Sequence, residues 1–358
     1  MAKTTKGPGS KPRVGLKDIA QSANVSISTV SHVINRTAPI SEDVRERVMQ
    51  AARETGYLGL RREREARGGI RKVLLASSAY GLAENDNNLF LWSILSALRA
   101  RCEQIGVKLL PHSPPGDHLS AEGIIRAAND ERADGVLLIH DDRRELLALL
   151  SERREELPPV VLINGEDPDM GIDTVSPQNR FAAFKATRWL TEIGHRNILH
   201  VTWHGRTTIS RRRDGFLDGM AEIGVRPENA PIFAFSGPDA WRAQPFLSDK
   251  LIEQVRSENI TAIFCGADDV ALRVHRSLHK AGYKVPEDIS LMGFDNIVHA
   301  EMSSPPLASV AVPVGHIGPV ALKLLEERLS ESFGPSAPAR RVELACTLIK
   351  RASVAPLR

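Results

Sequence analysis

Apolar positions along the chain follow two different spacings. In the first fifty residues they recur every three or four positions, and Leu16, Ile19, Ala20 and Ala23 form the first such stripe. From Val73 onward, short continuous apolar runs alternate with helical patterns, as in buried parallel strands that are joined by helices. The pattern predicts a small all-α head followed by an α/β body.

The head contains a predicted pair of short helices with a tight turn between them. The second helix has its apolar stripe at Val30, Val33 and Ile34. In the turn, Asn24 tolerates the left-handed conformation of a sharp helix exit, and Ser26 can cap the next helix. Small polar residues lie on its outward face, which suits the major groove of DNA. An ordinary helical hairpin is the alternative interpretation of this stretch.

A third helix and a charged linker follow. Ser41 can cap this helix and Gly56 can end it. Residues 57–72 then alternate Arg with Glu, have almost no apolar face and contain Gly68-Gly69. The linker is expected either to fold against the DNA backbone or to remain a solvated connection.

The body is predicted to hold two tandem series of strands and helices. Expected strands cover 73–78, 107–112, 135–140, 159–165, 197–203, 232–236, 262–267 and 289–294. Expected helices cover 89–105, 121–129, 144–154, 181–193, 211–223, 248–257 and 269–281. Two such series imply two doubly wound parallel sheets with a cleft between them, where ligands bind beyond the carboxyl ends of the strands.

Charge is distributed unevenly along the chain. Residues 1–72 carry 15 Lys and Arg against 7 Asp and Glu, although the formal net charge of all 358 residues is only +3. A basic head on an acidic body predicts a polyanionic partner for the head alone. Residues 1–13, which are rich in Lys, Gly and Pro, are expected to form a disordered basic arm.

Other features argue against several classes of protein. Three scattered cysteines have neither disulfide nor zinc spacing, which favours a reducing cytoplasm. The first 15 residues lack the apolar core of a signal peptide, and no apolar run approaches the about 18 residues of a membrane span. His275 and His279 stand one helical turn apart without a third ligand, and residues 167–173 depart from calcium-loop spacing. The sequence also lacks the G-x-S-x-G motif that carries the nucleophile of many hydrolases. We therefore expect no metal, no cofactor and no enzymatic activity.

Long motifs in both regions resemble one known family. The head reads LKDIAQSANVSISTVSHVIN and then ISEDVRERVMQAARETGY, and the body contains DGVLLI, PVVLIN, IGHRNILHV, RRRDGF, TAIFCGADDVAL and VPEDISLMGFDN. From about Val14 to Val354 the chain resembles the lac repressor/gal repressor family of bacterial transcription regulators. The resemblance implies a helix-turn-helix head, a hinge and a body like the periplasmic sugar-binding proteins. It also implies a homodimer, an operator in duplex DNA and a small-molecule effector in the cleft.

Domain boundaries follow from the patterns and the resemblance together. The expected division is 1–13 for the arm, 14–57 for the head, 58–71 for the hinge, 72–175 with 308–332 for the N-terminal ligand-binding subdomain, and 176–307 with 333–358 for the C-terminal one. No heptad helix follows the last predicted strand, VELACTLIKRA at 342–352, so a dimer is expected and not a tetramer.

The resemblance assigns DNA-binding residues in the head and hinge. Ile27, Ser28 and His32 match base-reading positions, and His32 stands where the family usually has an Arg that bonds guanine bidentately. An imidazole offers one good hydrogen bond there, so the base preference is expected to differ. Ala66 stands at the position of an apolar wedge, but its side chain is too small to unstack bases well. The expected phosphate contacts are Ser26, Thr29, Asn35, Arg61 and Arg62.

The same resemblance assigns effector-binding residues in the body. Arg212 opens the pattern R-x-x-G-F, and Asp295 follows the strand ISLMGF at the position of a ligand-binding Asp. A carboxylate accepts two hydrogen bonds at once, which suits vicinal hydroxyls of a sugar. Asn164 is expected to add a polar contact, Phe90 a contact at the cleft rim and Trp241 a stacking ring. Arg212 and Asp295 could instead pair only with each other or with helix ends.

Two functions are open at this point. The first is a ligand-responsive, sequence-specific DNA-binding regulator, most simply a repressor with a sugar-like effector. The second is a cytoplasmic sugar-binding or sugar-modifying protein without DNA activity, which would leave the basic helical head unexplained.

Overall fold

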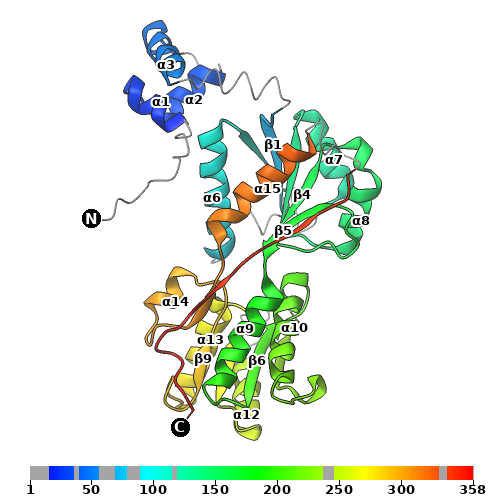
Figure 1. Ribbon diagram of the computed structural model, residues 1–358, viewed down its shortest axis with the longest axis vertical. Coiled ribbons are helices and arrows are strands. Elements are labelled where there is room, and N and C mark those ends of the chain that lie inside the picture. The colour runs from blue at the N-terminus through cyan, green and yellow to red at the C-terminus, as the bar shows by residue number, and fades with distance from the viewer. Residues whose placement is uncertain are drawn as a thin grey trace, which may run out of the picture.

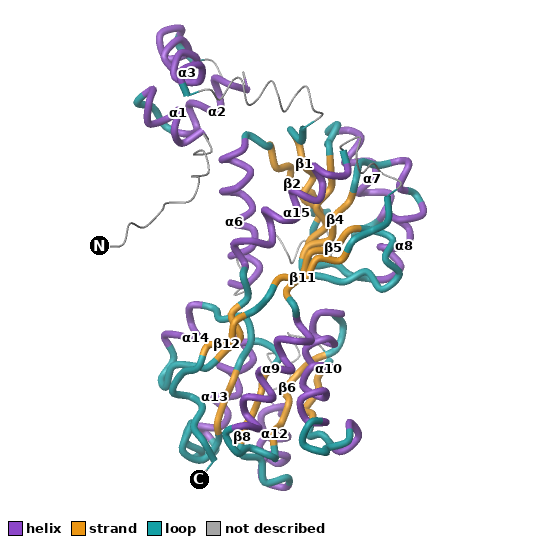
Figure 2. The backbone as a smooth tube through the Cα atoms, viewed as in Figure 1, coloured by secondary structure: helices purple, strands orange, loops and turns teal. Residues whose placement is uncertain are grey.

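The computed structural model describes residues 16–35, 40–55, 69–78, 89–114, 119–236, 246–329 and 337–357. It confirms an all-α head and an α/β body with parallel sheets (Figure 1). The strands of the body divide into two lobes, which lie one beyond the other along the long axis of the molecule (Figure 2). Among the described residues, no helix is both long and apolar enough to cross a membrane.

Three helices form the head: α1 (Leu16–Ala23), α2 (Ile27–Asn35) and α3 (Glu42–Glu54). Each contributes a fully buried side chain, Ile19, Val30 and Val48 respectively, so the apolar stripes meet in one small core. Ser41 precedes α3 as expected, but its side chain makes no capping hydrogen bond. Gly56, the expected end of that helix, lies outside the described residues.

The first lobe is built on a parallel sheet in the order β11-β5-β4-β3-β1-β2. All five residues of β3 are buried, because helices cover both faces of the sheet. Helices α6 and α15 cover one face, and α7 and α8 cover the other. The strands are β1 (Lys72–Ala76), β2 (Lys108–His112), β3 (Gly135–Ile139), β4 (Val160–Ile163), β5 (Asp173–Pro177) and β11 (Arg341–Leu344), and the helices are α6 (Leu89–Ile105), α7 (Ala121–Asp130), α8 (Arg144–Glu152) and α15 (Val314–Arg328).

The second lobe has a four-stranded parallel sheet in the order β7-β6-β8-β9. A short antiparallel pair, β10 and β12, continues it through isolated bridges beside β9. The strands are β6 (Ile198–Trp203), β7 (Ile232–Phe235), β8 (Ala262–Cys265), β9 (Ser290–Met292), β10 (Ser309–Ala311) and β12 (Thr347–Ile349). The helices are α9 (Asn179–Glu192), α10 (Thr207–Ala221), α12 (Phe246–Ser257), α13 (Asp268–Lys280) and α14 (Val298–Met302).

Two short segments lie in a different lobe from the one expected. Strand β11 pairs with β5 in the first lobe, although 333–358 was assigned to the second. Residues 308–311 join the second lobe through β10, although 308–332 was assigned to the first. The expected division also has three passages between the lobes, but the structure places the second after β10 and the third between β11 and β12. The predicted last strand is therefore two strands on different sheets. Strand β5 itself was missed, because its acidic approach resembles a loop.

Helices α9 and α10 pack unusually closely. A Cβ atom on Gly215 would lie 1.9 Å from the carbonyl oxygen of Arg180, and one on Gly219 would lie 2.6 Å from Cβ of Thr187. The R-x-x-G-F pattern therefore needs its glycine so that the backbones can approach. This approach fixes α10, which carries Arg212.

We expect Gly215→Ala to lower the free energy of unfolding by about 1–3 kcal/mol or more, because the added methyl group meets a backbone oxygen that cannot move away. Gly315→Ala is the matched control in α15, where an added Cβ would meet nothing within 4 Å, and it should be neutral or stabilising by up to about 1 kcal/mol. Urea denaturation of both variants measures the difference. Equal stability of the two variants would contradict the close packing of α9 and α10.

Candidate functional site

The turn before α2 has the geometry that its residues predict. Asn24 has a φ of +52°, in the left-handed region, so α1 ends sharply there. The hydroxyl of Ser26 accepts a hydrogen bond from the Thr29 backbone N–H at 3.0 Å, and the two side-chain oxygens lie 2.8 Å apart. This bond satisfies a free N–H at the start of α2, as expected of a helix cap.

The outward face of α2 presents residues that the resemblance assigned to DNA. Ile27 is 39% exposed although it is a large apolar residue, Ser28 is exposed and His32 is half-buried. Asn35 is the last residue of the helix, and its side chain is not among those that the structure describes. The hinge residues Arg61, Arg62 and Ala66 also lie outside the described residues.

In the body, several strands end in residues with a left-handed backbone. His140 follows β3, Asn164 follows β4, and Asp295 with Asn296 comes shortly after β9; their φ angles are 64°, 54°, 107° and 55°. A positive φ turns the chain sharply at the carboxyl edge of a parallel sheet. Polar side chains from both lobes are thereby collected at the strand ends.

Arg212 is the centre of the cluster in the second lobe. Its side chain is 3% exposed, and its guanidinium donates to Asn179 Oδ1 at 2.9 Å and to the Gly266 carbonyl at 2.7 Å. It forms an ion pair with Asp295 at 2.9 Å and stacks on the ring of Phe294 at 3.8 Å. The expected pair of Arg212 and Asp295 therefore exists, with the two side chains in direct contact.

Burial changes the acidity of the carboxyl groups here. It raises the pKa of Asp295 to about 6, even though Arg212 lowers that pKa. Burial also raises the pKa of Asp268 well above its usual value, with the charge of Asp295 adding to the effect. Asp268 accepts hydrogen bonds from Ser309 Oγ at 2.7 Å and the Ile297 N–H at 2.8 Å, so its role is to hold the loop after β9.

A second arginine, Arg206, reaches from the second lobe to the first. It precedes α10 and contacts both ring nitrogens of His140 at 2.7 Å. It also donates to the Asn164 carbonyl and lies 3.8 Å from Asp142. Burial lowers the pKa of His140 well below its usual value, with the positive charges of Arg206 and Arg212 adding to this, so the imidazole is neutral and can accept from a guanidinium.

Thr207 adds to this connection between the lobes. Its backbone N–H donates to Asp142 Oδ2 at 3.1 Å, and its hydroxyl donates to the same oxygen. The hydroxyl also accepts from the Glu166 N–H at 3.2 Å. The start of α10 is therefore joined to the carboxyl ends of β3 and β4. We call this set the interlobe site; it consists of His140, Asp142, Asn164, Arg206, Thr207, Arg212 and Asp295.

Buried polar atoms around the interlobe site lack hydrogen-bond partners among the described residues. Two are acceptors, the amide oxygens of Asn164 and Asn296, and two are donors, Nε1 of Trp203 and Nε of Arg206. The fifth is the hydroxyl of Thr202, which can do both. Buried polar atoms are nearly always paired, so such a group at facing strand ends is typical of a ligand site.

Phe90 and Trp241 are the two remaining residues that the resemblance assigned to effector binding. Phe90 is only 9% exposed and packs in the core of the first lobe, in the first turn of α6. Trp241 lies outside the described residues. Within the described part of the chain, no three His, Cys, Asp or Glu side chains are placed to hold a metal ion.

Sequence reasoning missed Arg206, His140 and Asn179. His140 could have been found, because it is the last residue of the predicted strand 135–140, and ligand-contacting residues gather at such strand ends. Arg206 and Asn179 lie at helix starts whose expected boundaries were a few residues too late.

The class of protein follows from these two sites: a helix-turn-helix head on a two-lobed body with a polar interlobe site. Residues 15–59 match the family model described as bacterial regulatory proteins, lacI family, and residues 187–354 match that of the periplasmic binding protein-like domain. The HTH-type transcriptional repressor PurR of Vibrio parahaemolyticus is 30% identical over 320 residues, which is 88% of this chain and 92% of that protein. PurR of Vibrio atlanticus is 28% identical over 96% of this chain and 99% of its own length.

Solved structures share the fold. The lac repressor dimer bound to operator and the anti-inducer ONPF superposes with a TM-score of 0.64 at 21% identity, covering 96% of this chain and 99% of that one. The regulator CelR in complex with cellobiose gives 0.67 at 23% identity, covering 94% and 99%.

The chain belongs to the lacI family of bacterial regulatory proteins. It is a DNA-binding transcription regulator and not an enzyme, which confirms the expected family, the fold and the DNA-binding part of the expected function. The sugar-like effector stays a prediction.

Proposed function

We propose that the protein is a repressor whose operator affinity is switched by a neutral or mildly anionic polyhydroxy ligand, a sugar or sugar derivative, in the interlobe site. The observation that carries the proposal is the group of buried donors and acceptors without partners at the facing strand ends. A sugar offers both kinds of group on each hydroxyl, so it can satisfy them together. Family structures solved with cellobiose and with ribose support a ligand of this class.

Four side chains are the proposed anchors. Asp295 accepts from ligand hydroxyls, Arg212 donates to ligand oxygens, and Asn164 offers its unpartnered amide oxygen. Arg206 donates through its unpartnered Nε, and a ligand at this place competes with its contacts to His140. Trp241 is a proposed outer contact, whereas Phe90 is not, because it packs in the core of the first lobe.

The proposed switch is the relative orientation of the lobes. Arg206 and Thr207 hold the second lobe against His140 and Asp142 of the first without any ligand. A ligand that takes over some of these contacts favours one orientation over others. Because coupling is reciprocal, operator binding must change ligand affinity by the same factor.

On the DNA side, we propose that α2 enters the major groove. Ile27, Ser28 and His32 then face base edges. Phosphate contacts come from Ser26, Thr29, Asn35, Arg61 and Arg62, and Ala66 stands at the wedge position without kinking DNA strongly. A dimer requires a pseudo-palindromic operator with half-sites about 10 bp apart, or a multiple of that distance.

An exposed apolar face supports a homodimer. Trp92 on α6 is 60% exposed, and Val298 and Met302 on α14 are 59% and 75% exposed. The two helices belong to different lobes and lie on the same side of the molecule (Figure 1). We propose that a second copy covers this face, so that both lobes contribute to the dimer. The cytoplasm is the proposed location.

We expect His32→Arg to shift the base preference at one position in each half-site by about 1–3 kcal/mol, because Arg can bond guanine bidentately where His offers one bond. Selection of binding sites from random DNA by the two proteins measures the shift. An identical consensus from both would mean that His32 does not read a base.

We expect Asp295→Ala to lose the ligand response, because ligand hydroxyls lose their acceptor at a cost of roughly 1–3 kcal/mol. Operator binding should remain, because Asp295 pairs with Arg212 within the second lobe and is not one of the contacts that hold the two lobes together. The ligand is first identified by thermal shift against sugars, sugar phosphates and purines. Calorimetry and operator binding on the same variant then test the role of Asp295, with Asp249→Ala on the exposed face of α12 as control.

The pH dependence of ligand affinity tests the role of Asp295 independently. Ionised Asp295 is the form that accepts from hydroxyls, and its pKa is about 6, so wild-type ligand affinity should rise as the pH increases through that value. The variant should lack this rise. Unchanged ligand affinity in Asp295→Ala would make the carboxylate structural.

A further inference from the structure

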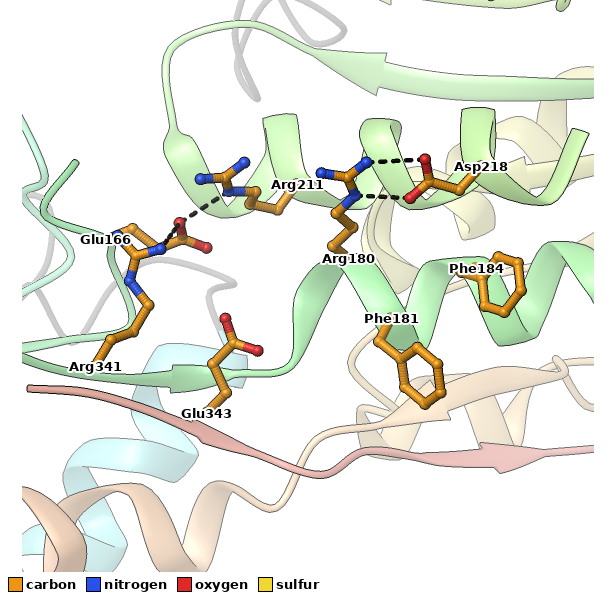
Figure 3. A pocket seen from close by; sticks show the side chains of 8 residues that line it. All are labelled: Glu166, Arg180, Phe181, Phe184, Arg211, Asp218, Arg341 and Glu343. Carbon is orange, nitrogen blue, oxygen red and sulfur yellow. Dashed lines mark hydrogen bonds and ion pairs between the residues drawn. The ribbon is translucent and has the colours of Figure 1, made fainter. Parts of the chain in front are cut away.

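A pocket of about 530 Å³ lies between the two lobes (Figure 3). The loop after β4 and strand β11 of the first lobe form one side of it, and α9 and α10 of the second lobe form the other. We propose that this pocket contains a charge switch, in which Arg211 of the second lobe pairs with Glu166 in one lobe orientation and with Glu343 in another. The proposal rests on the proposed function, in which lobe orientation is the switch, and it adds the two carboxylates that select between orientations.

The charged side chains that line the pocket divide by lobe. The first lobe contributes two carboxylates and one guanidinium, and the second contributes two guanidiniums and one carboxylate. Arg180 and Asp218, both of the second lobe, satisfy each other in a bidentate pair at 2.6 and 2.9 Å (Figure 3). Arg211 is the remaining charge of the second lobe in this lining, and it crosses to the first lobe to bind Glu166 at 2.9 Å.

The two carboxylates of the first lobe are paired unequally. Glu166 is nearly buried and is shared by two guanidinium groups, because Arg341 lies 3.5 Å from the oxygen that Arg211 also binds. Glu343 is exposed, lines the same pocket and has no hydrogen-bond or ion-pair partner among the described residues. Its side chain extends from β11 into the pocket (Figure 3). One carboxylate therefore has two cations, while its neighbour has none.

A second pairing gives each of these carboxylates one cation. Arg341 stays beside Glu166 because it donates to the Asp167 carbonyl at 2.9 Å, and its buried Nε has no partner among the described residues. When Arg211 leaves Glu166, Arg341 alone supplies the counter-ion that a buried carboxylate needs. Arg211 then pairs with Glu343. The two pairings differ only in whether Arg211 binds a nearly buried or an exposed carboxylate, so neither is strongly favoured.

The distance between the two pairings suits a movement of one lobe along the other. Arg341 and Glu343 are two residues apart on β11, so their side chains lie on the same side of the strand and about 6–7 Å apart along it. Packed elements in known switches exchange partners by steps of about one helical turn, roughly 5.4 Å. Asp214, which lies 3.6 Å from Arg211, is on the same helix and moves with it, so it does not select between the pairings.

The test measures the distance between the lobes in the full-length protein without ligand or DNA. Spin labels are attached at Arg126→Cys on α7 and Ser257→Cys on α12, because both positions are exposed and the three native cysteines are buried. Pulsed electron paramagnetic resonance should then show two distances, one of them that of the orientation described here. A single distance that no variant below changes would overturn the proposal.

Changes at the two carboxylates should shift the two populations in opposite directions. Glu343→Gln removes the second partner of Arg211 and should raise the share of the orientation described here by about 1.5–5-fold relative to the other. Glu166→Gln weakens the present pair and should lower that share by a similar factor. Glu152→Gln, at an exposed position on α8, is the control and should change nothing. Absence of a shift in Glu343→Gln, or shifts in the same direction in both variants, would contradict the switch.

A double-mutant cycle shows whether Glu343 acts through Arg211. No ion pair joins these two side chains in the orientation described here, so any coupling between them reports the second orientation. In an Arg211→Gln background, Glu343→Gln should no longer shift the two distances. A shift that persists without Arg211 would overturn the proposal. Operator affinity of the same variants is a separate readout: distances that shift while operator affinity does not would contradict the proposed function and leave the charge switch standing.

Discussion

The arrangement of the strand ends in the second lobe depends on the contacts of one buried group, the guanidinium of Arg212. It holds three separate segments together: the start of α9 through Asn179, the end of β8 through Gly266, and the loop after β9 through Asp295. A buried charge is tolerated only when it is paired and hydrogen-bonded, and here every contact is with a strand end or a helix start. Arg212 is therefore a structural centre of the second lobe as well as a proposed ligand anchor.

The position of this arginine depends in turn on glycine. Gly215 and Gly219 let α10 approach the backbone of α9, and the start of α10 then carries Arg206 and Thr207 across to the first lobe. Packing in one lobe thus determines which contacts join the two. Because those contacts are hydrogen bonds and ion pairs between polar groups at the strand ends, a ligand with similar groups can compete with them. A regulator needs such a balance between two lobe orientations.

The sequence alone predicted what depends on local pattern. Continuous apolar runs located the inner strands to within a few residues. The family resemblance, and not the pattern, assigned ligand roles to Asn164 and Asp295 at the strand ends, and these roles stay predictions. Reasoning from pattern failed where the answer depends on tertiary contacts. The segment 342–352 was expected to be one strand, because nothing local reveals a passage between lobes near Cys346. Arg206 was missed because its partners, His140 and Asp142, are more than sixty residues away and meet it only when the lobes pack.

The most direct test of the account is operator affinity after removal of one interlobe contact. Asp142→Ala takes away the acceptor that joins Thr207 and Arg206 to the first lobe, whereas Asp141→Ala removes a carboxylate that bonds Arg143 within that lobe. If lobe orientation controls the heads, Asp142→Ala should change operator affinity by about fivefold or more, and Asp141→Ala should change it little. Wild-type operator affinity in Asp142→Ala, with small-angle scattering showing a changed lobe arrangement, would contradict the account.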